Sequence, residues 1–94
     1  MADGLIMMRP FAAMIANGNK KVEQRDSKPP DDKISVPIYI LAKGKVYAEV
    51  KITSYFKNGG HWDWNLELIK AFKPPVNYEH PQGAQKWVKN VTLK

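Results

Sequence analysis

Cysteine is absent from the sequence, which excludes a disulfide framework and a metal site built from thiolates. Histidine is scarce, because His61 and His80 are the only two, and a pair of loop histidines does not supply a metal ligand set. We therefore expect no metal and no cofactor. Long apolar runs are also missing: the run from Leu5 to Met8 is too short for a signal segment or a membrane span. These absences predict a cytoplasmic protein without membrane association.

Glycine-rich loops that could hold a phosphate are lacking too. The one glycine pair, Gly59-Gly60, does not stand between a strand and a helix, which is the context such a loop requires. We find no internal repeat, linker or low-complexity segment in the 94 residues. A chain of this length buries roughly 60–65% of the surface that its unfolded form exposes, enough for one core. The sequence therefore predicts a single domain over residues 1–94.

Acidic residues are sparse in the second half of the sequence. Residues 1–42 hold six Lys or Arg against five Asp or Glu, a balance of +1, whereas residues 43–94 hold nine Lys against four acids, a balance of +5. A basic surface favours polyanions, because cationic side chains that neutralise phosphates release counterions. A solvated surface that keeps the protein soluble has the same composition. Charge alone thus favours RNA or single-stranded DNA as a partner without deciding the matter.

Alternating apolar and polar residues predict a domain made mainly of strands. A short strand is expected at Leu5 to Met8, followed by a helix near residues 10–17. Pro10 suits the first turn of that helix, Gly18 suits its end, and the i, i+3, i+4 spacing of Phe11, Met14 and Ile15 predicts one apolar face. The segments that predict further strands are 21–25, 34–40, 46–52, 62–72 and 85–93.

Two proline positions constrain these strands. Pro37 cannot donate to a ladder, so its strand should lie at an edge or carry a bulge there. The pair Pro74-Pro75 should end the strand that begins near Trp62. Together the segments predict an α+β, mostly β fold: a small barrel of five or six strands with one or two short helices.

The most informative segment is Gly18 to Arg25, where a helix end, a tight turn and a charged strand follow one another. Strand periodicity places Lys21, Glu23 and Arg25 on one face, and Lys20 enters from the turn before them. A carboxylate flanked by cations accepts hydrogen bonds, and an arginine offers planar donors, so the group can read a base edge or hold a phosphate. A cross-strand ladder of ion pairs on a solvated face would show the same pattern.

This segment resembles the opening of ASCH domains, which begins with a proline and an aromatic residue and continues as G-x-K-x-x-E-x-R. The residues that match this pattern are Pro10, Phe11, Gly18, Lys20, Glu23 and Arg25. The aromatic strand that runs from Trp64 to Pro74 is similar to the family's long strand. The closing segment with Gly83, Gln85 and Trp87 is similar to its last one. The resemblance covers nearly the whole chain.

The resemblance implies a PUA-like β-barrel with helices at its rim and a cleft lined by the Lys/Glu/Arg strand, which binds a nucleobase or nucleotide of RNA or DNA. Lys20 and Arg25 would contact phosphate or base, and Glu23 would accept a base amino group. Trp62 could stack on a base, although alternating tryptophans are as often part of a core. The candidate nucleic-acid-binding residues are Arg9, Lys20, Lys21, Glu23, Arg25 and Trp62.

Two other functions stay open. Some small bacterial relatives of ASCH domains deacetylate N-acetylated cytidine, a modified nucleoside, and this chain resembles them at Lys20 and Arg25. Those hydrolases carry a threonine where this sequence has Glu23, and a catalytic carboxylate in a helical insertion for which the turn at 58–60 leaves no room. Lys20 and Glu23 would be catalytic only in that case. The third reading is a phage or accessory regulator that binds a protein, which suits the length but has no motif.

Overall fold

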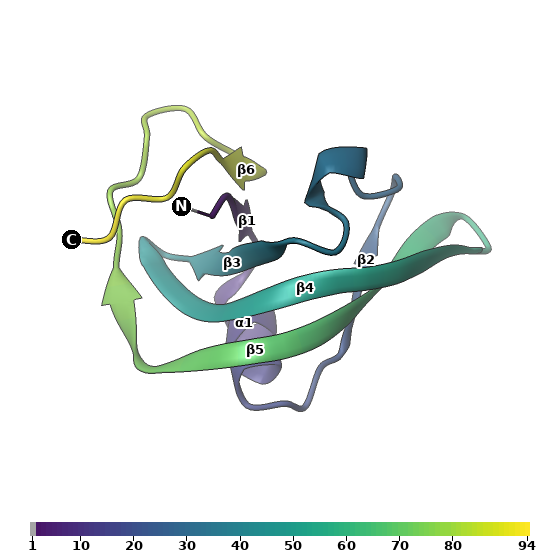
Figure 1. The fold of residues 1–94 in the computed structure, drawn as a ribbon, viewed down its shortest axis with the longest axis horizontal. Helices are drawn as coiled ribbons and strands as arrows, with labels where there is room; N and C mark the ends of the chain where they lie inside the picture. Colours follow the sequence, from purple (N-terminus) through teal and green to yellow (C-terminus); the bar gives the residue numbers. More distant parts are fainter. Residues whose placement is uncertain (1) are drawn as a thin grey trace.

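The computed structural model describes residues 2–94 and contains one mixed sheet of six strands with one α-helix. The two longest strands are antiparallel neighbours in the sheet (Figure 1). The strands are β1 (Gly4–Ile6), β2 (Val22–Arg25), β3 (Pro37–Ala42), β4 (Lys45–Asn58), β5 (His61–Asn77) and β6 (Trp87–Val88). Their order in the sheet is β2-β5-β4-β3-β1-β6. The expected α+β, mostly β class is confirmed.

The sheet is not found closed into the predicted barrel. Its two outermost strands, β2 and β6, do not pair with each other among the described residues. β2 has four residues and β6 has two, so each edge offers little backbone for a closing ladder. The pairing of β1 with β3 is parallel and the other pairings are antiparallel, which gives a mixed sheet.

The helix α1 (Arg9–Ala16) confirms the expected position, but Ile15 alone of the expected apolar face is buried. Met8 is its N-cap, proline stands in the first turn, and Gly18 follows with φ +79°, a left-handed conformation that glycine adopts readily. The buried residues are Ala12, Ile15 and Ala16. Phe11 and Met14, predicted to share the buried face, are 43% and 40% exposed. The two alanines let the helix approach the sheet closely, which turns the larger side chains outward.

The proline pair does not end β5, contrary to the prediction. The strand continues to Asn77, because Ala71 pairs with Ala48 and Val76 pairs with Val46. Four residues of β5 therefore lie opposite a single residue of β4, and both prolines fall in this irregularity. A bulge tolerates proline because its backbone does not need to donate to the ladder.

Two other strands are shorter than predicted. β3 begins at Pro37, a first-residue position that suits proline, whereas Ile34 makes only an isolated bridge to Ile52. A 3-10 turn, η1 (Asp31–Lys33), occupies the segment before it. The predicted closing strand over 85–93 is reduced to β6, and Asn90 has φ +51°, which is incompatible with a continuous strand.

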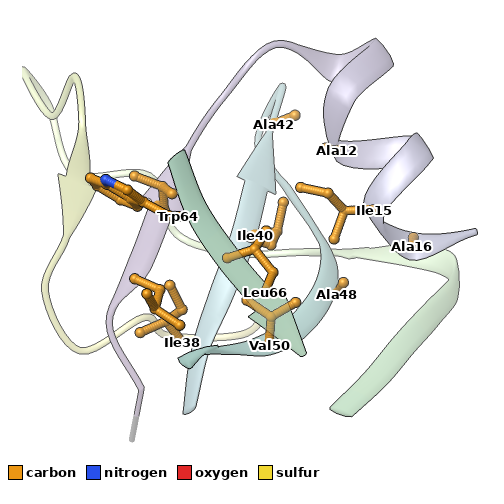
Figure 2. Packing of buried hydrophobic residues seen from close by; sticks show 12 residues of the cluster. Ala12, Ile15, Ala16, Ile38, Ile40, Ala42, Ala48, Val50, Trp64 and Leu66 are labelled. Atoms are coloured by element: carbon orange, nitrogen blue, oxygen red, sulfur yellow. The ribbon is translucent and has the colours of Figure 1, made fainter. Parts of the chain in front are cut away.

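The main core lies where α1 packs on β3, β4 and β5. Alternate strand residues point into it, and Ile40, Val50 and Ile15 are fully buried there (Figure 2). Trp64 lies at the end of this cluster remote from the helix (Figure 2). A second cluster holds the C-terminal segment against the sheet and consists of Leu41, Val46, Tyr78, Val88 and Val91. No helix within residues 2–94 is long and apolar enough to cross a membrane.

Candidate functional site

Strand β2 places two of the predicted site residues on the inner face of the sheet. In the antiparallel ladder Glu23 lies opposite Trp64 and Arg25 lies opposite Trp62, and opposite residues share a face. Gln24, between them, lies opposite Asp63 and faces the other way. Period-two alternation therefore sets the two charged side chains among tryptophans rather than in open water.

Glu23 is the centre of a network with two cations, which we call the charged network (Lys20, Glu23 and Arg25). Glu23 is only 5% exposed. One carboxylate oxygen, Oε2, accepts a hydrogen bond from Arg25 Nε at 2.8 Å, and the other, Oε1, lies 3.6 Å from Lys20 Nζ. A carboxylate taken out of water requires such partners, so both cations are needed to hold it there. The prediction that these three residues meet is confirmed.

Arg25 also connects the edge strand β2 to β1. Its Nη2 donates to the backbone carbonyl of Ile6 at 3.1 Å, and its guanidinium carbon lies 6.0 Å from the centre of the Trp64 ring system. The two strands do not pair through their backbones. The guanidinium therefore bridges the opening of the sheet and is held in a fixed orientation by three neighbours.

A pair of stacked tryptophans adjoins Arg25. The ring systems of Trp64 and Trp87 are 6.5 Å apart and inclined by 17°, and Trp64 Nε1 donates to the carbonyl of Ser27 at 2.9 Å. Beside them lies a pocket of about 280 Å³. Its lining includes both tryptophans, Arg25, Lys28 and Lys86. This volume is slightly below the roughly 300 Å³ at which small-molecule sites begin, so the pocket has room for one small planar group.

An aromatic ring also flanks the other end of the charged network. Lys20 Nζ lies 5.2 Å from the centre of the Phe11 ring, which projects from α1. A hollow of about 450 Å³ beside Lys20 is lined also by Lys21, Thr53 and Glu67. Lys21 is exposed and precedes the first residue of β2, and no ion pair joins it to Glu23 among the described residues. Strand periodicity placed Lys21 on one face with Glu23 and Arg25, but the lysine that pairs with Glu23 is Lys20.

The remaining predicted residues lie away from the charged network. Arg9 is exposed at the start of α1 and lines a separate hollow of about 750 Å³ with Met8, Lys43 and Gln85. Trp62 is half-buried opposite Arg25, and Lys28 Nζ lies 5.7 Å from its ring centre. Strand alternation places Trp62 on the face of the charged network. Arg9 lies away from Glu23, and no local pattern in the sequence related the two.

Several participants were not predicted as site residues. The Ile6 carbonyl and Trp87 come from segments that only the folded chain brings to Arg25, whereas Lys28 follows Arg25 by three residues in the sequence. The signal for Trp87 was its place in the closing segment, but its stacking on Trp64 depends on where β6 docks. A backbone carbonyl carries no sequence signal at all, so Ile6 could not be found without the structure.

A second ionic cluster supports the tryptophan pair from outside. Lys33 Nζ lies 2.8 Å from Asp3, 2.9 Å from Asp32 and 5.6 Å from the centre of the Trp87 ring system. The hydrogen bond from Lys33, followed by that from the Asn90 backbone, lowers the pKa of Asp3 below 3.8. The same carboxylates raise the pKa of Lys33 above 10.5. These ion pairs hold η1 against the tryptophan that lines the pocket.

The two histidines make pairwise contacts at separate places. Tyr78 Oη lies 2.7 Å from His80 Nδ1, and burial raises the pKa of that tyrosine above 10.0. His61 Nε2 lies 3.4 Å from Asp63 Oδ1 at the β4–β5 turn. Within residues 2–94 no three His, Asp or Glu side chains are grouped so as to hold a metal ion.

No protein-family model matches the sequence, and no curated protein matches it either. The interpretation of the site therefore depends on the residues and their geometry.

Proposed function

We propose that this protein is a nucleic-acid-binding module of the ASCH type, which recognises a nucleobase or nucleotide of RNA or single-stranded DNA at the charged network. The observation that carries the proposal is the buried carboxylate of Glu23, held between two cations beside a pocket walled by stacked tryptophans. A site for phosphate alone would contain only cations. A carboxylate among donors instead suits the mixed donor and acceptor edge of a base.

The charged network and the pocket divide the task of recognition, and Arg25 belongs to both, whereas Glu23 does not line the pocket. A carboxylate has about four lone-pair positions. Arg25 uses one of those on Glu23, and Lys20 forms a longer ion pair at 3.6 Å, so the carboxylate can accept a base amino group as well. The base packs against the tryptophan pair, and Lys86 at the pocket supplies a cation for its phosphate. Arg25 contributes the guanidinium protons that its protein partners leave free.

A PUA-like barrel is part of the same proposal. The two edges of the sheet approach each other through side chains, since Arg25 of β2 bonds to Ile6 of β1 and Trp64 stacks on Trp87 of β6. In this arrangement the opening that a closing ladder would fill is the place where the ligand binds.

Titration of a fluorescently labelled single-stranded oligonucleotide at low salt tests the proposal. We expect Glu23→Gln and Arg25→Lys each to weaken binding, because the first removes the charge-assisted acceptor and the second removes the planar fork while keeping the positive charge. Glu79→Gln makes the same change as Glu23→Gln, and Lys73→Arg makes the reverse exchange of cations. Both are at exposed positions outside the site and should leave the affinity unaltered. Absence of binding by the wild-type protein at low salt would refute the proposal.

The same preparation separates recognition from hydrolysis. Both oxygens of Glu23 face cations, a setting that suits an acceptor of hydrogen bonds rather than a general base, and β4 and β5 are joined directly at Gly59-Gly60. These features support binding without turnover. Incubation with N-acetylated cytidine, followed by chromatography, should yield no cytidine. Turnover that disappears in Lys20→Ala would replace this proposal by the amidohydrolase alternative.

A further inference from the structure

The outer half of the β4–β5 hairpin forms an arm, defined here as residues 54–58 and 61–65. β3 leaves the sheet at its pairing of Pro37 with Lys51, so the arm is accompanied only by β2 on its other side. The hairpin turn extends well beyond the rest of the molecule (Figure 1). The arm therefore offers a surface that adjoins the charged network and reaches into solvent.

The two faces of the arm differ in chemistry. Tyr55 lies opposite Trp64 and Lys57 opposite Trp62, so these side chains share the face that carries Arg25. The Tyr55 and Trp62 rings are 5.9 Å apart and tilted by 55°. The other face carries Phe56, opposite Asp63 in the ladder. Aromatic rings thus continue outward from the tryptophan pair along one face only.

Cations accompany these rings. Lys28 Nζ lies 5.7 Å from the centre of the Trp62 ring, and Lys57 lies directly across the ladder from it. Neither lysine forms an ion pair with a described residue. The single acidic residue of the arm, Asp63, belongs to the opposite face, where Asn58 Nδ2 donates to it at 3.0 Å. The aromatic face is therefore positively charged and complements a phosphate backbone.

We propose that this face is a second nucleotide subsite, at which the base next to the recognised one stacks on Trp62 beside Tyr55 while its phosphate lies between Lys28 and Lys57. The inference depends on the proposed function and specifies its ligand as a single strand of at least two nucleotides rather than a free nucleoside. Arg25 and Trp62 are opposite in the ladder, which puts their Cβ atoms about 5 Å apart, so the two subsites adjoin. Aromatic rings interleaved with lysines bind single strands with little sequence preference.

Comparing a 5′-mononucleotide with a labelled tetranucleotide of the same base tests the subsite. Wild-type protein should bind the tetranucleotide more tightly. Trp62→Ala should weaken tetranucleotide binding by roughly 5- to 100-fold, the loss of one stacked base, and should leave mononucleotide binding nearly unchanged. Trp62→Phe should retain part of the affinity because it keeps a ring. Phe56→Ala removes a ring that is 50% exposed on the opposite face and should leave the affinity for both ligands unchanged.

Lys57→Glu gives a second test that does not depend on removing a half-buried ring, because Lys57 is exposed. This variant should weaken binding of the tetranucleotide selectively and make the salt dependence of that binding shallower. Equal losses for both ligands, or none, in Trp62→Ala and Lys57→Glu would overturn the subsite while leaving recognition at Arg25 intact. Both proposals would be overturned if the wild-type protein bound neither the mononucleotide nor the tetranucleotide.

Discussion

At the scale of single residues, the decisive feature is a carboxylate placed where a strand should carry an apolar side chain. Glu23 is buried on the inner face of the sheet, and one of its oxygens meets Arg25 while the other meets Lys20. Replacing a whole buried ion pair by apolar residues can leave stability unchanged. Removing one partner lowers stability, because the remaining charges then lie partly buried and unpaired. The network is therefore sensitive to any single deletion within it.

Glu23→Ala should accordingly destabilise the protein by about 1–3 kcal/mol, less than the roughly 3–5 kcal/mol of a fully buried pair because both cations reach water. Glu67→Ala, at an exposed position of β5, is the matched control and should change stability by less than about 0.5 kcal/mol. Urea denaturation followed by tryptophan fluorescence measures both. Similar stabilities for the two variants would contradict the role assigned to the network.

At the scale of elements, close backbone packing decides how the short strands dock. Gly4 begins β1, between β3 and β6, and a Cβ added there would meet the Leu41 side chain at 2.4 Å and that of Val91 at 2.9 Å. Both neighbours are fully or almost fully buried, so they have no room to withdraw. The glycine is needed for space rather than for an unusual backbone angle.

We therefore expect Gly4→Ala to cost about 1–3 kcal/mol through overpacking. Gly60→Ala provides the comparison, because a Cβ at the tip of the hairpin meets no atom within 4 Å. Thermal unfolding monitored by circular dichroism should show a clearly lower Tm for Gly4→Ala and almost no change in Tm for Gly60→Ala. Equal Tm values would mean that β1 shifts to make room.

At the scale of the whole molecule, one ion cluster joins three distant segments. Asp3 near the N-terminus pairs with Lys33 of η1 at 2.8 Å and accepts a hydrogen bond from the Asn90 backbone at 2.8 Å. The carboxylate is favoured in the folded state, so the pKa of Asp3 is lower there than in the unfolded chain. Its contribution to stability is present above the unfolded pKa, near 3.8, and disappears as the pH falls through the lower folded value.

Asp3→Asn should therefore lower the Tm at pH 6–7, and its effect should shrink as the pH falls below about 3.8 toward the lower folded pKa of wild-type Asp3. Tm profiles of the two proteins measured over this pH range check this expectation. Asp31→Asn, a neutralisation at an exposed position of η1, should leave the profile parallel to that of the wild type. A constant difference between wild type and Asp3→Asn across the range would contradict the assigned pKa shift.

The charge of the whole molecule makes a prediction about affinity. The net charge is +6, and the proposed strand path passes the lysines and arginine of two adjoining subsites. Each phosphate neutralised on a single strand contributes roughly −0.7 to the slope of log K against log salt. Three to five such contacts give a slope between about −2 and −3.5, measurable by fluorescence anisotropy at several salt concentrations. A slope near zero would show that phosphates do not contribute.

How far the sequence determines this molecule can be judged from particular elements. Period-two alternation correctly predicted the strand that contains Val50 and the shared face of Glu23 and Arg25, because both are local consequences of strand geometry. The helix position followed from Pro10 and Gly18. The apolar face of that helix was predicted correctly at Ile15 and wrongly at Phe11 and Met14, because spacing alone fits two neighbouring faces, and the closeness of the sheet selected the one with the alanines.

What only the tertiary structure decided is how the ends of the sheet meet. The continuation of β5 past Pro74-Pro75 depends on its partner strand, and the short β6 depends on where the C-terminal segment packs. The bond from Arg25 to the Ile6 carbonyl and the stack of Trp64 on Trp87 join residues that no local pattern relates. Local strand geometry thus determined which residues form the charged network. Long-range packing determined the pocket beside it, because the free energy of docking distant segments is not encoded in any one segment.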